Sequence, residues 1–81
     1  MTTTIPEVIT MLEELQEDTS VPRNVRSKIV DIIQGLQDKK ETIMKVSRAL
    51  HDLEEISEDN NVQSYTRMQL FNVASMLESV H

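Results

Sequence analysis

The sequence predicts an all-α fold: an antiparallel four-helix bundle in a single domain that covers residues 1–81. Three observations support this prediction. The composition favours helices, because the chain has one Gly, two Pro and few aromatic residues beside abundant Leu, Ile, Val, Glu and Gln. Apolar residues recur at spacings of three and four along four segments. The second half of the chain also repeats the first half at an offset of 41 positions.

The offset of 41 positions aligns identical residues as well as apolar ones. Any two amphipathic helices share an apolar phase, but the Glu-Asp, Val and Arg matches lie outside that phase and favour an internal duplication. Each unit, 5–37 and 43–80, therefore corresponds to a pair of helices. The identical pairs are Leu12 and Leu53, Glu13 and Glu54, Glu14 and Glu55, Glu17 and Glu58, Asp18 and Asp59, Val21 and Val62, Arg26 and Arg67, and Leu36 and Leu77.

The first helix is predicted over residues 5–17. Thr4 is a suitable N-cap, Glu7 completes a capping box, and Pro6 is tolerated in the first turn. The apolar residues that follow keep helical spacing. They are Ile5, Val8, Ile9, Leu12 and Leu15.

The second helix is predicted over residues 22–36. A short polar connection, 18–21, precedes it, and Pro22 is placed at the first helical position. Because the connection is short, the first two helices are expected to be antiparallel neighbours. The apolar stripe of the second helix consists of Val25, Ile29, Ile32, Ile33 and Leu36.

The third helix is predicted over residues 39–57, with Asp38 and Glu41 as a second capping box. Its stripe consists of Ile43, Val46, Leu50, Leu53 and Ile56. The fourth helix is predicted from residue 63 to the C-terminus, with one row made of Met68, Phe71, Ala74 and Leu77 and a second row beside it made of Leu70, Val73, Met76 and Val80. The second helix of each unit is more broadly apolar than the first. Either these helices are central in the monomer or their excess apolar surface faces a second copy, and we expect a homodimer.

The spacing of the Leu, Asp, Val-Arg and Ile residues in the first unit resembles a HEAT-type repeat, so the chain is predicted to be two HEAT-like helical hairpins. The resemblance implies a structural turn motif in which Asp18 pairs with Arg26 beside Pro22, and Asp59 pairs with Arg67. We expect these residues to lock the turns rather than to bind a ligand. The positions that carry the resemblance are Leu12, Leu15, Asp18, Val25, Arg26, Ile29, Ile33 and Leu36.

The net charge of −6 is divided unevenly along the chain. Residues 23–48 hold seven of the eight bases against three acids, a net +4, whereas the remainder carries −10. This separation is either solvated surface or a means of steering a charged partner or a second copy. The candidate partner surface consists of Arg23, Asn24, Lys39, Lys40, Lys45 and Arg48. The acidic total and the lack of interleaved aromatic residues argue against general nucleic-acid binding, and RNA or ribosome association is the weaker alternative.

Catalytic, metal and cofactor sites are not predicted. The chain has no Cys, no Glu-x-x-His pair, and one Gly, which cannot build a phosphate loop. His51 is isolated from any nucleophile and carboxylate pattern. No apolar run approaches the ~20 residues that span a membrane, and no signal peptide is recognised, so a cytoplasmic location is expected. We therefore predict a protein that is not an enzyme, with no cofactor and no small-molecule substrate.

Residues 12–26 and 53–67 resemble the signature of a small, uncharacterised archaeal protein family of the UPF type. The Val-Pro-Arg-Asn element at 21–24 is the most specific part of the resemblance, which covers nearly the whole chain. The resemblance implies a compact four-helix bundle in a cytoplasmic archaeal protein, and it implies no activity. A small non-enzymatic protein-interaction module is predicted on other grounds: the duplicated turn motif, the broad apolar faces of the second and fourth helices, and the lack of a catalytic residue pattern.

Overall fold

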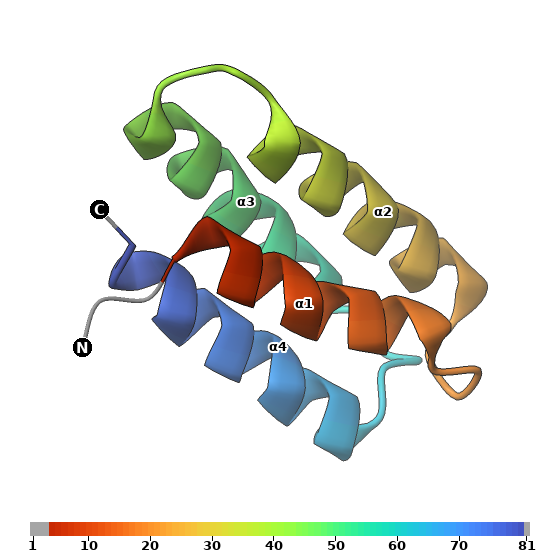
Figure 1. Cartoon of the computed structure of the whole chain (residues 1–81). Coiled ribbons are helices and arrows are strands. Elements are labelled where there is room, and N and C mark those ends of the chain that lie inside the picture. The colour runs from red at the N-terminus through yellow and green to blue at the C-terminus, as the bar shows by residue number, and fades with distance from the viewer. Residues whose placement is uncertain (1–3, 81) are drawn as a thin grey trace.

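A computed structural model of the chain describes residues 4–80, which form four α-helices and no strand (Figure 1). The helices are α1 (Ile5–Glu17), α2 (Arg23–Gln37), α3 (Thr42–Ser57) and α4 (Ser64–Glu78). α1 packs against α2 and α4, and α3 packs against the same two helices, so one core lies between all four. The radius of gyration, 11.7 Å, matches the value of about 12 Å expected of a compact chain of this length.

The predicted bounds and capping box of α1 are confirmed. The Glu7 carboxylate accepts a hydrogen bond from the Thr4 N–H at 3.4 Å, and Pro6 lies in the first turn. The helix ends at Glu17 because the backbone of Asp18 is extended, although its N–H still donates to the Leu15 carbonyl at 3.2 Å. Local signals were sufficient here because both ends are built from neighbouring residues.

The starts of the other three helices differ from the prediction. Pro22 is the N-cap of α2 rather than its first residue, and α2 ends at Gln37, one residue later than predicted. The predicted capping box of Asp38 with Glu41 is wrong, because Asp38 ends α2 and its carboxylate accepts from the adjacent Lys39 N–H at 2.7 Å. This short-range bond competes with a helix start. α3 consequently begins three residues late, and α4 begins at Ser64.

The core repeats along the chain with the offset predicted for the duplication. Eight buried positions of the first half correspond, 41 residues later, to eight buried positions of the second half. One pair combines Val25 with Thr66, two side chains of nearly equal volume. The buried pairs are Val8 and Ala49, Leu12 and Leu53, Leu15 and Ile56, Val21 and Val62, Val25 and Thr66, Ile29 and Leu70, Ile32 and Val73, and Leu36 and Leu77.

The two apolar rows predicted on the fourth helix differ in burial. Leu77 is buried, but Met68 and Phe71 are 58% and 57% exposed. The core row of α4 instead consists of Thr66, Leu70, Val73 and Leu77, which match the core row of α2 at the offset of 41. α4 has two apolar rows, and hydropathy alone does not distinguish which one is buried. In α3, Ile43 is likewise 72% exposed although it was assigned to the core stripe.

The sequence predicted that no segment is long and apolar enough to span a membrane. Within residues 4–80, each helix is too short or too polar to cross a bilayer.

Candidate interaction surfaces

The two inter-helix turns, α1–α2 and α3–α4, have the same hydrogen-bond pattern. Asp18 Oδ1 accepts from the Ser20 N–H at 2.9 Å, and Asp59 Oδ1 accepts from the Asn61 N–H at 2.8 Å. The carbonyl of each aspartate accepts from the N–H three positions later, at 3.1 and 3.2 Å. Each carboxylate therefore closes its own turn, as Asp side chains commonly do.

These bonds lower the pKa of both aspartates below the ordinary value of 3.8. For Asp18 the main cause is the hydroxyl of Ser20, which donates at 2.7 Å, followed by the Ser20 N–H. For Asp59 the main cause is the Asn61 N–H, followed by the Asn24 side chain, which donates at 2.8 Å. Donors that bond to the ionised form favour it.

The lowered pKa values predict a loss of stability in acid. A carboxylate with a depressed folded-state pKa stabilises the protein above its unfolded pKa, near 3.8, and this contribution disappears as the pH falls through the folded pKa. Asp18→Asn combined with Asp59→Asn keeps an acceptor oxygen but removes the titration. We expect the urea midpoint of this variant to lie below that of the unaltered chain at pH 7 and to approach it at pH 3. A constant difference between pH 7 and pH 3 would contradict the prediction.

The predicted Asp–Arg ion pairs are not formed among residues 4–80. The Arg67 guanidinium instead donates from Nε to the Ser57 carbonyl at 3.0 Å, and from Nη2 to the carbonyls of Asp59 and Val62 at 3.3 and 3.4 Å. It thereby ties the end of α3 and the following turn to α4. The carboxylate of Asp59 is directed elsewhere, toward Asn61 and Asn24.

Arg26, the counterpart of Arg67, makes none of the equivalent bonds. Its Nε is buried and has no acceptor among the described residues. The charge of Arg26 still contributes, as the smallest cause, to the lowered pKa of Asp18. A shallow pocket of 360 Å³ lies beside it, lined also by Gln16, Arg23, Ser27 and Val30. The two halves of the chain thus share a turn but differ in how the arginine is held.

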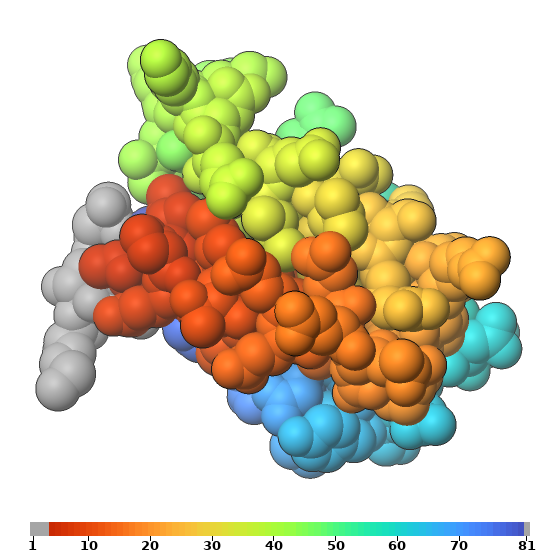
Figure 2. Space-filling model, turned by 45° about the vertical axis from the view of Figure 1, so that its right-hand side comes forward, coloured from red at the N-terminus to blue at the C-terminus, as the bar shows by residue number. Residues whose placement is uncertain are grey.

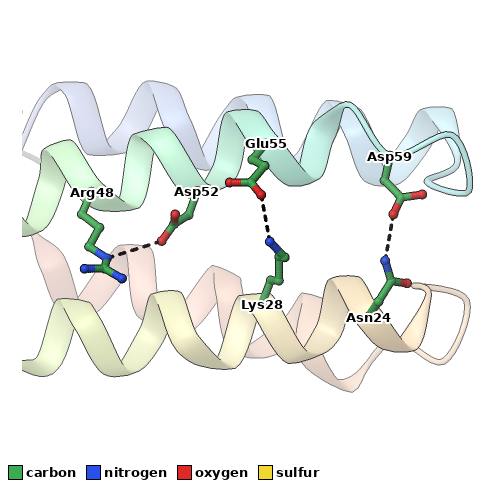
Figure 3. Close-up of polar contacts among 6 residues, drawn as sticks. All are labelled: Asn24, Lys28, Arg48, Asp52, Glu55 and Asp59. Carbon is green, nitrogen blue, oxygen red and sulfur yellow. Dashed lines mark hydrogen bonds and ion pairs between the residues drawn. The ribbon is translucent and has the colours of Figure 1, made fainter.

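Three polar contacts mark the side of the molecule where α2 and α3 meet (Figure 3). Lys28 Nζ lies 3.0 Å from Glu55 Oε1, and Asn24 bonds to Asp59, so both contacts cross between the first and second halves. Arg48 and Asp52 approach to 4.0 Å within α3. The ion pair raises the pKa of Lys28 and lowers that of Glu55, each mainly through their hydrogen bond. Both side chains are about half exposed, so the pair contributes little stability.

A groove of 670 Å³ lies between α2 and α3 and collects part of the predicted partner surface. Its charged lining alternates in sign: Lys28, Lys40, Lys45 and Arg48 are accompanied by Asp31, Asp38 and Asp52. In addition, the Lys45 ammonium donates to the Asp38 carbonyl at 2.9 Å. The groove is therefore nearly neutral, which does not favour a polyanion such as RNA.

The six residues of the predicted partner surface do not form one patch. Lys40, Lys45 and Arg48 line the groove, and Lys39 follows the end of α2 beside it. Arg23 instead lines the pocket of Arg26, and Asn24 bonds to Asp59 at the turn end of α2. The basic residues that lie in one segment of the sequence therefore lie in separate places on the surface of the structure.

The sequence predicted excess apolar surface on the second and fourth helices, but it did not identify which residues of the fourth helix stay exposed. Tyr65, Met68 and Phe71 are 63%, 58% and 57% exposed, and they include both aromatic residues of the chain. We define the α4 face as the exposed residues between 64 and 77, none of which is charged: Ser64, Tyr65, Met68, Phe71, Asn72 and Ser75. A signal was present in the sequence, because the fourth helix carries two apolar rows and a monomer core needs one.

Comparison with known proteins identifies the family. The family model described as an uncharacterised protein family (UPF0147) matches residues 1–80. The chain belongs to UPF0147. A UPF0147 protein of the archaeon Sulfurisphaera tokodaii is 44% identical over 77 residues, which are 94% of this chain and 86% of that protein. The UPF0147 protein MJ1419 of Methanocaldococcus jannaschii, also an archaeon, is 39% identical over 90% of this chain and 80% of its own length.

A solved structure confirms the four-helix all-α fold. The crystal structure of the unknown-function protein MMP1188 superposes with a TM-score of 0.90 and 36% identity, over 95% of this chain and 89% of that chain. The resemblance predicted from the sequence is therefore confirmed at the level of the uncharacterised family and its archaeal relatives.

Within residues 4–80 of this UPF0147 chain, no group of three or more His, Cys, Asp and Glu side chains is placed to hold a metal ion. His51 lies exposed on α3. The groups with shifted pKa values are Asp18, Lys28, Glu55 and Asp59, and each shift is explained by the turn or ion pair described above.

Proposed function

We propose that this UPF0147 chain is a small, non-enzymatic protein-interaction module that acts in the cytoplasm. Its architecture is an antiparallel four-helix bundle of two HEAT-like hairpins, and its contact surface is the α4 face. The repeated turn bonds and the eight buried pairs related by 41 positions support the duplication. The occupant of the α4 face is another protein.

The observation that carries the proposal is the placement of Tyr65, Met68 and Phe71. These side chains lie three residues apart on one helix, more than half exposed, in a chain that has no other aromatic residue. The cores of protein–protein interfaces are enriched in Tyr, Phe and Met and depleted of charge. The α4 face has both properties, whereas the α2–α3 groove carries seven charged side chains.

The chain encloses one hydrophobic core of its own, which supports a contact that adds to the fold. The surface area of 5414 Å² is close to the about 5,000 Å² expected of a folded monomer of 9.3 kDa. The broad apolar stripe of α2 is buried within the chain, including both Ile32 and Ile33. Among residues 4–80, the large apolar side chains that stay exposed are Ile43 and Met44 in the first turn of α3, and Tyr65, Met68 and Phe71, which extend along α4. An interaction there is an addition to a stable fold rather than a condition of it.

The test is to purify the native assembly from its own cells at low salt, with and without nuclease, and to weigh it by light scattering. We expect a nuclease-insensitive assembly heavier than the chain alone. Met68→Asp should release the chain at its monomer mass, and Arg48→Glu, on the other side of α3, should leave the assembly intact.

Two results would overturn the proposal. A monomer under all conditions would leave the α4 face without a partner. A nuclease-sensitive assembly that Arg48→Glu disrupts and Met68→Asp does not would favour RNA or ribosome association through the basic segment 23–48. An assembly of two chains that depends on Met68 would keep the interaction module and replace its occupant by a second copy.

A further inference from the structure

We infer that the partner segment on the α4 face is a basic amphipathic helix of another protein. This inference rests on the proposed function and adds the chemistry of the partner. It follows from three features of the structure: the charge on either side of the α4 face, the shape of the face, and the position of the chain's own basic residues.

One side of the α4 face is bordered by α1, which packs against α4. α1 carries four acidic residues and no basic residue. All four are exposed, and Figure 2 shows α1 lying across the open front of the molecule between α2 and α4. The four residues are Glu7, Glu13, Glu14 and Glu17. Gln16 lines the pocket shared with α2, and Glu13, three positions earlier, lies on that side of α1. Glu7 and Glu14, seven positions apart, lie on the opposite flank, toward α4.

The other side of the α4 face is bordered by α3. The bases of α3, Lys45 and Arg48, line the groove toward α2 and so lie on the flank away from α4. The opposite row of α3 contains Ile43, Leu50 and Glu54, at helical spacings of seven and four. Glu54 is exposed, and so is Glu58 just beyond the end of the helix.

The only base near this side, Arg67, is bonded to three backbone carbonyls. Its charge is therefore held at the turn and is not presented beside Met68. The α4 face is thus uncharged and has acidic residues on both flanks. Its apolar side chains, Tyr65, Met68 and Phe71, are called the apolar strip. A partner that is apolar at its centre and basic at its edges would bury the strip and pair with both flanks.

The shape of the strip fits a helix. α4 has 15 residues, a length of about 22 Å at 1.5 Å per residue. Its exposed apolar side chains recur at i, i+3 and i+6, so they form a ridge that runs obliquely to the helix axis rather than a pocket. A helix that lays its apolar side chains along such a ridge is a recurrent mode of peptide recognition.

A second copy of the chain fits this surface less well. A two-fold contact across α4 brings identical surfaces together, so the acidic flanks of one copy would approach those of the other. Like charges at an interface oppose association. Four bases do not pair with these flanks, because they line the α2–α3 groove together with Asp31, Asp38 and Asp52: Lys28, Lys40, Lys45 and Arg48.

The test uses a model peptide of about 18 residues, long enough to form a helix on binding, built from Leu, Lys and Ala with Leu on one face. A matched peptide has Glu in place of every Lys. The protein has one Tyr and no Trp, so the fluorescence of Tyr65 reports directly on the α4 face. We expect saturable binding of the Lys peptide with a change in Tyr65 emission, weakened by salt, and no binding of the Glu peptide.

Met68→Asp separates docking from general attraction between opposite charges. The substitution makes the protein more acidic, so attraction alone predicts tighter binding of the Lys peptide. Docking on the apolar strip predicts weaker binding by about 30-fold, because a central contact is lost. Phe71→Ala should weaken binding about tenfold. Met44→Asp adds the same charge at an exposed methionine of the α2–α3 groove and should not weaken binding.

The outcomes distinguish this inference from the proposed function. Tighter binding to Met68→Asp, or equal effects of Met68→Asp and Met44→Asp, would overturn the inference. Met68-dependent binding of the Glu peptide, or Met68-dependent dimers alone, would also overturn it and leave the interaction module standing. Helix content by circular dichroism must be unchanged in each variant, and the exposure of all three positions makes misfolding unexpected.

Discussion

Leu12→Ala and Leu53→Ala are each expected to reduce the free energy of unfolding by about 3 kcal/mol. The two leucines are related by the offset of 41 positions, and their side chains are 0% and 1% exposed. Truncation loses buried methyl groups and leaves a cavity that the surrounding helices only partly fill. For a domain of 81 residues, this is a large share of the about 5–10 kcal/mol that such domains possess.

The effect is measured by urea unfolding followed by circular dichroism, and by thermal unfolding, in which the midpoint should fall by about 15 °C. Ile43→Ala is the matched control, because Ile43 was assigned to the same apolar stripe as Leu53 but is 72% exposed. Its cost should stay within about 0.5 kcal/mol. If Ile43→Ala and Leu53→Ala cost the same, the orientation of α3 described above is incorrect.

Arg67→Ala is expected to cost about 2 kcal/mol, whereas Arg26→Ala should cost less than about 1 kcal/mol. Arg67 donates to three backbone carbonyls, of Ser57, Asp59 and Val62, and removing it leaves partly buried acceptors without a donor. Arg26 occupies the equivalent position, but its buried Nε has no acceptor among the described residues. Removing Arg26 therefore costs little stability, because its Nε makes no hydrogen bond that would be lost.

The comparison is made by urea unfolding of the two single variants and of Arg67→Lys. Lysine retains the charge but cannot reach several carbonyls with one planar group, so its cost should lie between those of the unaltered chain and Arg67→Ala. Equal costs for Arg26→Ala and Arg67→Ala would mean that the two turns are held in the same way, contrary to the hydrogen bonds described.

Several features of the fold were predictable because they depend on neighbouring residues. Thr4, Pro6 and Glu7 define the start of α1 within one turn, so this bound was predicted correctly. The end at Glu17 was also predicted correctly. Asp38 shows the limit of the same reasoning. Its carboxylate could either cap the next helix or accept a hydrogen bond from the adjacent N–H of Lys39, and in the structure it accepts from Lys39. A local motif predicts well when its alternatives are poor and fails when two local bonds compete.

The candidate site was predictable only in part. The sequence indicated the charge division, yet the fold distributes Arg23, Asn24 and Lys45 among a pocket, a turn contact and a groove. It also indicated that the fourth helix has more apolar surface than a monomer needs. Which residues remain outside was not predictable from that helix alone, because the rows of Leu70 and Phe71 are similarly apolar.

The sequence by itself determined the helical class, the family, and the 41-residue relation that Leu12 and Leu53 share. These depend on periodicity and residue identity, which are properties of the linear chain. Only the tertiary structure decided that Phe71 faces solvent and that Arg67 binds carbonyls instead of the Asp59 carboxylate. The physical reason is that four helices share one core. Packing against α1 and α3 selects one row of α4, and the guanidinium bonds to the acceptors that this packing places beside it.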